Sequence, residues 1–260
     1  MVAIGASLLF LGTGSGVTVG KGLRSSGGFI LTLGDNQFHI DPGVGAVVKA
    51  AEYGVNLRMT TAVMISHSHL HHANDANAVI DAMSYSGFDR KGVLIANKTA
   101  ITGTDEYPPA VSAHYREYLE RFITVDRGQR IGINEIEIEA LTARHSDPNS
   151  LGFKFIAHDL TITYSGDTVH AVDIVEQYLN SHILILNVPS IKKQGANLCI
   201  EDAVEIINKV KPQVAILTHF GHDLLKADPL YEIREVQKRT GVQTIAAKDG
   251  MAINPTSYSR

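Results

Sequence analysis

Four histidines occur within six residues of this chain, in the run His67-Ser68-His69-Leu70-His71-His72. Imidazole is a ligand for zinc, copper, iron and nickel, and so dense a group of imidazoles in one short turn is typical of a metal site. The run directly follows Ala62-Val63-Met64-Ile65, an apolar stretch that predicts a buried strand. We therefore expect the histidines at the carboxyl end of a strand, where open α/β sheets place their chemistry.

Three further candidate ligands also follow stretches that predict strands. His145 comes after residues 136–141, Asp167 after 160–164 and His219 after 214–217. Together with the histidine run they form a set of imidazoles with one carboxylate, which is large enough for two transition-metal ions. A magnesium or calcium site would instead need a set made of oxygen ligands.

The elements that must position these side chains alternate along the chain. Strands are expected at 8–11, 29–33, 38–40, 62–65, 93–96, 136–141, 160–164, 183–186 and 214–217. Helices are expected at 45–53 and 76–83, from Pro108-Pro109 through Phe122, and at 203–210 and 229–240. No linker or low-complexity segment interrupts this alternation, so we expect one domain of two similar halves. Two central sheets with helices outside would bury the apolar strands on both faces.

Bulk properties narrow the class of protein. The chain has 260 residues, with 44% hydrophobic and 19% charged residues, as is ordinary for a globular enzyme. The net charge of −4 argues against a protein that grips nucleic acid by charge alone. The single cysteine, Cys199, cannot form an internal disulfide, which favours a reducing, cytoplasmic compartment. The apolar start from Val2 to Leu11 predicts a first strand, not a signal peptide, and no apolar run is long enough for a membrane span.

The motifs together resemble the metallo-β-lactamase-fold hydrolases, and most of all the ribonuclease Z and cyclic-phosphodiesterase branches. The resemblance rests on the histidine run, the later single His145, Ser165-Gly166-Asp167-Thr168 and Thr218-His219-Phe220-Gly221. The opening 10–16 and the sequence Ile40-Asp41-Pro42-Gly43 match as well. The likeness extends from Leu8 to about Gly250. It implies an α/β fold of the four-layer αββα sandwich type, as a single domain over residues 1–260.

The resemblance also implies roles for individual residues. His67, His69 and His145 would hold one metal ion, His72 and His219 would hold a second, and Asp167 would bridge the two. Zinc is the expected metal, with nickel, iron and manganese as alternatives. Asp41 would either fix the histidine run from outside the ligand set or simply begin a helix; both interpretations stay open.

One residue departs from the family pattern, His-x-His-x-Asp-His, because His71 stands where the aspartate belongs. That aspartate binds the second metal and orients the attacking hydroxide. A histidine can ligate, but it is neutral and cannot accept the hydrogen bond of the hydroxide while it holds a metal. We expect an altered second site, and a mononuclear enzyme is an open alternative.

The resemblance implies a hydrolase that uses a metal-bound hydroxide, with phosphodiesters as the favoured substrates. Hydrolysis of lactones, thioesters or β-lactams at the same site is one alternative, and a di-iron oxidoreductase is another. A metal-binding protein without catalysis is a third. His222 either donates a proton to the leaving group or is a surface residue at a helix start.

Substrate contacts and partners are less closely defined. The segment Gly12–Gly16 either cradles a phosphate or forms a plain turn, and Arg24, Lys192 and Lys193 either bind an anionic substrate or are merely solvated. We expect a small anionic or ester substrate, no membrane partner and no stable nucleic-acid complex. The aromatic stripe Tyr115, Tyr118 and Phe122 is expected to pack in the core. The alternative is that its segment, from about Gly103 to Thr124, covers the cleft or joins two subunits in a homo-oligomer.

Overall fold

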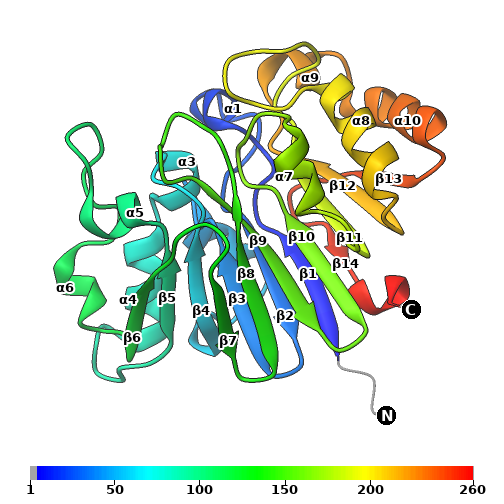
Figure 1. The fold of residues 1–260 in the computed structure, drawn as a ribbon. Coiled ribbons are helices and arrows are strands. Elements are labelled where there is room, and N and C mark those ends of the chain that lie inside the picture. Colours follow the sequence, from blue (N-terminus) through cyan, green and yellow to red (C-terminus); the bar gives the residue numbers. More distant parts are fainter. Residues whose placement is uncertain (1–4, 260) are drawn as a thin grey trace. The chain divides into compact units, whose positions relative to one another are not determined.

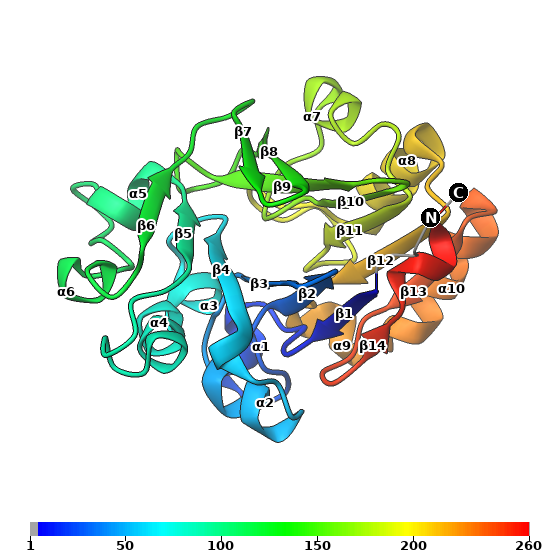
Figure 2. The same ribbon diagram turned by 90° about the horizontal axis from the view of Figure 1, so that it is seen from below.

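The computed structural model describes residues 5–259, and these form two compact units. Unit 1 consists of residues 5–126 with Asp249–Asn254, and unit 2 consists of Arg127–Lys248 with residues 255–259. Each unit holds one seven-stranded mixed sheet with helices packed against it (Figures 1 and 2). The structure does not describe residues 1–4 and 260, which belong to the expected single domain. Residues 2–4 of the expected first strand are among them. A single domain over the whole chain stays a prediction.

The sheet of unit 1 has the order β14-β1-β2-β3-β4-β5-β6. Its strands are β1 (Ala6–Phe10), β2 (Phe29–Leu33), β3 (Asn36–Ile40), β4 (Thr60–Ile65), β5 (Val93–Ala96), β6 (Arg121–Thr124) and β14 (Ala252–Ile253). The pairings from β14 to β3 are antiparallel, and those from β3 to β6 are parallel. The connecting helices are α1 (Gly16–Gly20), α2 (Ala46–Glu52), η1 (Leu57–Met59), α3 (Leu70–Ala73), α4 (Ala76–Ser84), α5 (Lys98–Thr102) and α6 (Ala113–Arg116).

The sheet of unit 2 has the order β13-β12-β11-β10-β9-β8-β7. Its strands are β7 (Arg130–Ile133), β8 (Ile136–Thr142), β9 (Leu151–Ala157), β10 (Leu160–Tyr164), β11 (Ile183–Asn187), β12 (Val214–Thr218) and β13 (Gln243–Ala246). From β7 to β10 the pairings are antiparallel, and from β10 to β13 they are parallel. Its helices are α7 (Val172–Glu176), α8 (Ile200–Val210), α9 (His222–Lys226), α10 (Pro229–Thr240) and η2 (Pro255–Tyr258). The same succession of pairings in both sheets confirms the expected α/β class with two similar halves.

The expected helix from Pro108-Pro109 through Phe122 is wrong. Only Ala113–Arg116 is helical there, and Arg121–Thr124 forms the edge strand β6, paired in parallel with β5. Phe122, Ile123 and Thr124 are residue types that fit a pleated sheet, and tertiary pairing with β5 overrides the helical spacing of the preceding aromatic residues.

Helix α8 shows how the apolar pattern builds the core of unit 2. Its buried positions recur at helical spacing: Ile200, Ala203, Val204, Ile206, Ile207 and Val210. They pack on side chains of β11 and β12, including Leu184, Leu186 and Leu217. Cys199 precedes the helix, and its N–H donates to Asp202 at 2.9 Å. Cys199 is therefore a buried capping residue with a free thiol.

The end of the chain returns to unit 1 and ties down its beginning. Strand β14 pairs with β1, and Asp249 just before it accepts hydrogen bonds from the N–H and hydroxyl of Thr13 at 2.9 and 2.7 Å. Its other carboxylate oxygen accepts from the N–H of Ser25 at 2.8 Å. The loop between β1 and β2 is thus fixed by a residue more than two hundred positions away.

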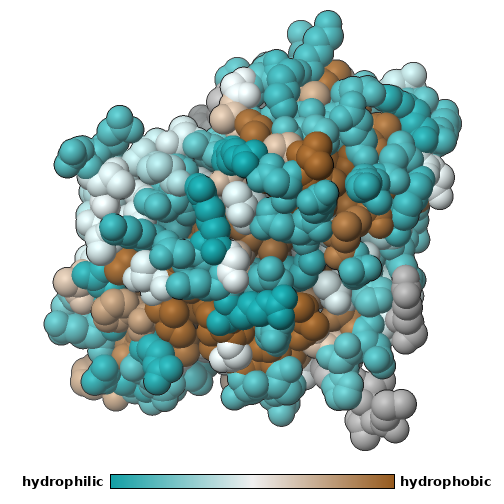
Figure 3. Space-filling view, viewed as in Figure 1, coloured by the Kyte–Doolittle hydropathy of each residue, from teal (hydrophilic) through white to brown (hydrophobic). Residues whose placement is uncertain are grey.

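Hydrophilic side chains predominate on the face seen in Figure 3. None of the helices within residues 5–259 combines the length and apolar character that a membrane span would require.

His39 of β3 makes the stability of the protein depend on pH. Its side chain is fully buried, with Nε2 3.1 Å from the carbonyl oxygen of Gly27, and burial lowers the pKa of His39 from 6.5 to about 4. The unfolded chain therefore binds a proton before the folded chain does, so stability present above pH 6.5 is lost as the pH falls toward 4. We expect about 3 kcal/mol of lost stability from this residue.

Urea unfolding of the metal-free protein between pH 7 and 4.5 measures this loss, with His39→Gln and His158→Gln compared with the wild type. His158 is exposed, so its replacement should leave the pH dependence unchanged. Parallel pH dependences for the wild type and His39→Gln would contradict the expectation.

Candidate metal centre

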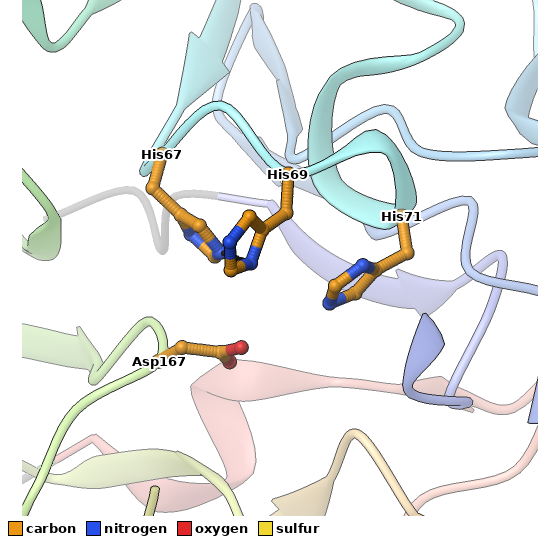
Figure 4. Close-up of side chains that lie close together, drawn as sticks. All are labelled: His67, His69, His71 and Asp167. Atoms are coloured by element: carbon orange, nitrogen blue, oxygen red, sulfur yellow. Dashed lines mark hydrogen bonds between the residues drawn. The ribbon is translucent and has the colours of Figure 1, made fainter. Parts of the chain in front are cut away.

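The histidine run forms a tight turn between β4 and α3. His67 and His72 are buried, and His69 and His71 are half-buried. Figure 4 shows the rings of His67, His69 and His71 projecting from the same side of the turn, and the ligand atoms of these three lie within 4.8 Å of one another. The turn therefore gathers several imidazoles in unit 1, as the sequence predicts.

The spacing of two of these nitrogens suits a shared ion. His67 Nε2 lies 3.1 Å from His69 Nδ1. In a tetrahedral zinc site with Zn–N bonds of about 2.0–2.1 Å, neighbouring ligand nitrogens lie about 3.3 Å apart. The other nitrogen of His67, Nδ1, lies 3.0 Å from the hydroxyl of Ser66. That contact fixes the ring and leaves Nε2 for a metal.

The carboxylate of Asp41 fixes the histidine turn through hydrogen bonds. Its Oδ1 accepts from the N–H of Ser66 at 2.7 Å, and its Oδ2 accepts from the hydroxyl of Ser66 at 2.7 Å and from His72 Nδ1 at 2.8 Å. The nearest helix, α2, begins later, with Gly45 at its N-cap. Asp41 is therefore not a helix cap, and of the two open interpretations the structure supports the residue that fixes the histidine turn.

The ring of His71 packs against a glycine. A Cβ atom at Gly16 would lie 2.9 Å from His71 Nδ1. The His71 ring stacks on that of His69 at a centroid distance of 5.4 Å, and its ligand atom lies within 4.8 Å of that of His72. The residue that departs from the family pattern thus stands among the other imidazoles instead of turning to the surface.

The three candidate ligands of unit 2 also come together. Asp167 Oδ2 lies 3.2 Å from His219 Nε2 and 3.7 Å from His145 Nε2; Asp167 and His219 are buried, and His145 is half-buried. Asp167, which Figure 4 labels, follows β10, His219 follows β12, and His145 follows β8. Because β10, β11 and β12 run parallel, their carboxyl ends meet at one edge of the sheet.

Further partners orient this second cluster. His145 Nδ1 donates to the carbonyl oxygen of Ala196 at 2.8 Å, which leaves Nε2 for a metal. Asn187 Nδ2 donates to Asp167 Oδ1 at 2.7 Å and lies 3.0 Å from the hydroxyl of Tyr164. Ligand residues of metal sites are commonly held by such outer hydrogen bonds.

Two of the residues at these strand ends adopt unusual backbone angles. Asp41 has φ of 51° and His219 has φ of 65°, in the left-handed region that non-glycine residues seldom occupy. Such strain costs about 1 kcal/mol or more and is concentrated at functional sites, because the surrounding structure must enforce it.

Other candidates remain outside the two clusters. His222 is the first residue of α9 and is exposed, and its side chain makes no hydrogen bond or ion pair within residues 5–259. Lys193 pairs with Asp202 at 2.8 Å, and Lys192 is exposed. Arg24 donates to the hydroxyl of Thr13 at 2.7 Å. A phosphate contact by any of these cations stays a prediction.

The glycines of the opening loop have a packing reason. A Cβ at Gly12 would lie 2.3 Å from the backbone nitrogen of Gly27, and one at Gly14 would lie 2.5 Å from the hydroxyl of Thr18. Of the two alternatives for this segment, a phosphate cradle or a plain turn, these close approaches favour the plain turn.

Sequence reasoning named Gly16 and Gly43 only as parts of motifs, and it missed three further residues that shape the clusters: Ser66, Tyr107 and Asn187. Ser66 directly precedes His67, and Gly43 belongs to the Asp41-Pro42-Gly43 motif, so their positions carried a signal. Asn187 carried no signal, and Tyr107 carried only its place in the segment from about Gly103 to Thr124. Their contacts with Asp167 and His69 form only in the folded chain.

Comparison with known proteins identifies the family. The family model described as the beta-lactamase superfamily domain matches residues 36–220, more than two thirds of the chain. The chain belongs to the beta-lactamase superfamily. This superfamily protein is 28% identical over 252 residues to an uncharacterized protein of Methanocaldococcus jannaschii. The aligned region covers 95% of this chain and 94% of the relative.

Solved structures share the fold of this superfamily protein. The metallo-beta-lactamase fold protein YhfI from Bacillus subtilis matches with a TM-score of 0.79 at 16% identity, over 96% of this chain and 99% of that one. A diphosphatase of the PhnP family matches with a TM-score of 0.73 at 17% identity, over 95% and 96% of the two chains. These likenesses confirm the expected metallo-β-lactamase fold. The match to the superfamily model supports a metal-dependent hydrolase.

Proposed function

We propose that this protein is a metal-dependent hydrolase of small phosphodiesters. The proposed ligands are the residues that the sequence resemblance implies: His67, His69, His71, His72, His145, Asp167 and His219. The observation that carries the proposal is the arrangement of outer partners. Ser66, Asp41 and Ala196 each hold one ring nitrogen, of His67, His72 and His145 respectively, so that the opposite nitrogen of each ring is presented for a metal.

The donor set supports two zinc ions as the metal content. It is rich in imidazole nitrogen and has one carboxylate, Asp167, which suits zinc better than magnesium or calcium. Nickel, iron or manganese are the alternatives. When bound, the ions would supply a hydroxide nucleophile near neutral pH and stabilise the negative charge that develops at the reacting centre.

Residues next to the ligands would orient them, and another would donate a proton to the leaving group. Asp41 and Ser66 orient His67 and His72, and Asn187 holds one oxygen of Asp167, so that little reorganisation is needed during the reaction. We propose His222 as the proton donor to the leaving group, because it follows His219 by three residues and is exposed to solvent.

The substrate proposal rests on chemistry at phosphorus. The diphosphatase of the PhnP family, whose fold this chain shares, acts on phosphate compounds by name. A net charge of −4 supports a small ester over a nucleic acid. We also propose a cytoplasmic location, which the single buried cysteine supports.

The experiment that tests the function combines metal content with turnover. Metal is measured by plasma mass spectrometry on untagged protein, and hydrolysis of bis(p-nitrophenyl) phosphate is assayed for the wild type and for His71→Asp. We expect two ions per chain and turnover in the wild type. Turnover should be roughly tenfold or more higher in His71→Asp, because a carboxylate can accept a hydrogen bond from the nucleophile.

His158→Asp makes the same exchange at an exposed position and should match the wild type. One ion or none in the wild type, with turnover only in His71→Asp, would mean that the natural protein is not a binuclear hydrolase.

A further inference from the structure

Tyr107 approaches the histidine turn from a different segment of unit 1. It lies on the loop between α5 and α6, and its hydroxyl is 3.5 Å from His69 Nε2. The two rings are tilted by 50° with their centroids 5.8 Å apart. The phenol and the imidazole are thus neighbours through both their rings and their polar atoms.

The contact falls on Nε2 of His69, and the other nitrogen of that ring, Nδ1, is the one near His67. His69 Nδ1 lies 3.1 Å from His67 Nε2, so Nδ1 is the atom that would share an ion with His67. Nε2 is on the opposite side of the ring and must carry the hydrogen when Nδ1 binds a metal. A hydroxyl oxygen at Nε2 is therefore placed to accept that hydrogen.

In neighbouring candidate ligands too, one ring nitrogen would bind the metal, and the other, outer nitrogen contacts a protein group. His67 has Ser66 at its outer nitrogen, and His72 has Asp41. Tyr107 occupies the equivalent place for His69. The difference is that Ser66 and Asp41 belong to strand ends of the sheet, whereas Tyr107 comes from a loop.

That loop is held in a defined shape. The hydroxyl of Thr104 accepts from the N–H of Tyr107 at 3.1 Å and from that of Glu106 at 3.3 Å, and the N–H of Thr104 donates to the carbonyl of Tyr107 at 2.7 Å. Gly103 has φ of 73°, and a Cβ there would lie 2.7 Å from the Tyr107 carbonyl oxygen. A closed turn of this kind presents the phenol ring in one place.

We propose that Tyr107 is a positioning residue that accepts the Nε2 hydrogen of His69 and so directs Nδ1 toward the metal. This role rests on the metal centre of the proposed function. It gives the loop from Gly103 to Pro109 a task in metal binding, and it predicts that changes in this loop alter metal affinity without altering any ligand.

The test uses cobalt as the probe and two matched variants. Tyr107→Phe keeps the ring and removes only the hydroxyl. Tyr118→Phe removes another tyrosine hydroxyl that contacts a histidine, His114 Nε2 at 2.8 Å, but that histidine is not a candidate ligand. Cobalt affinity is measured by competition with a chelator, and the visible spectrum of the cobalt protein reports the geometry of the ligands.

We expect Tyr107→Phe to bind cobalt about tenfold more weakly, with a shifted spectrum, while Tyr118→Phe matches the wild type. Gly103→Ala, which displaces the turn, should weaken binding in the same direction. Equal affinity and spectrum in Tyr107→Phe and the wild type would overturn the role of Tyr107 alone. Failure of the wild type to bind cobalt would overturn the metal centre and this role together.

Discussion

Replacing Asp167 with asparagine is expected to lower kcat/KM for bis(p-nitrophenyl) phosphate by about a thousandfold or more. Asp167 Oδ2 faces both His219 and His145, so this oxygen is placed to carry negative charge into the ligand set. Asparagine keeps the shape but loses the charge. Metal ligation contributes several kcal/mol to transition-state stabilisation, and each 1.36 kcal/mol corresponds to a tenfold change in rate.

The control is Asp173→Asn, in the same unit. Asp173 is exposed and pairs with Arg144 on the surface, so its loss should leave turnover and metal content unchanged. Steady-state kinetics and metal content are measured for both variants. If Asp167→Asn keeps turnover within tenfold of the wild type, Asp167 does not have the role proposed for it.

The second large effect is expected from Gly43→Ala, with a loss of about 3 kcal/mol in the free energy of unfolding. A Cβ at Gly43 would lie 2.0 Å from the backbone oxygen of His71 and 2.2 Å from that of Ser26. Both neighbours are backbone atoms and cannot rotate away, so the histidine turn must shift as a whole. Overpacking of this kind destabilises proteins by about 1–3 kcal/mol.

Urea unfolding of the metal-free protein measures the stability, and metal content measures the effect on the turn. Gly20→Ala is the matched control, because a Cβ there would meet nothing within 4 Å. We expect Gly43→Ala also to retain less metal than Gly20→Ala does. Equal stability of the two variants would show that the turn can yield without cost.

The sequence could predict the strands that carry the ligands because their apolar runs are distinctive. The stretch 62–65 lies within β4, 136–141 within β8, and 214–217 within β12. The candidate ligands could be named from residue type and from their place after these strands. Their grouping within each unit then follows from the shared carboxyl edge of neighbouring strands.

What the sequence could not predict depends on contacts between distant segments. The edge strand β6 forms because β5 offers a partner, whereas the local pattern favoured a helix. Asn187 reaches Asp167 only because β10 and β11 pair in a particular register. Tyr107 reaches His69 through a loop whose shape depends on Thr104 and on the left-handed angle of Gly103. Such partners have no periodic signal along the chain.

The return of the chain to unit 1 has a consequence for the order of events during synthesis. Thr13 and Asp249 are separated by 236 positions, so a ribosome adding about 5–20 residues per second would produce them roughly 10 to 50 s apart. Until then β1 lacks its β14 neighbour, and the loop that carries Gly16 toward His71 lacks its anchor. We therefore expect the histidine turn of the nascent chain to stay loosely held until nearly all of unit 2 has been translated.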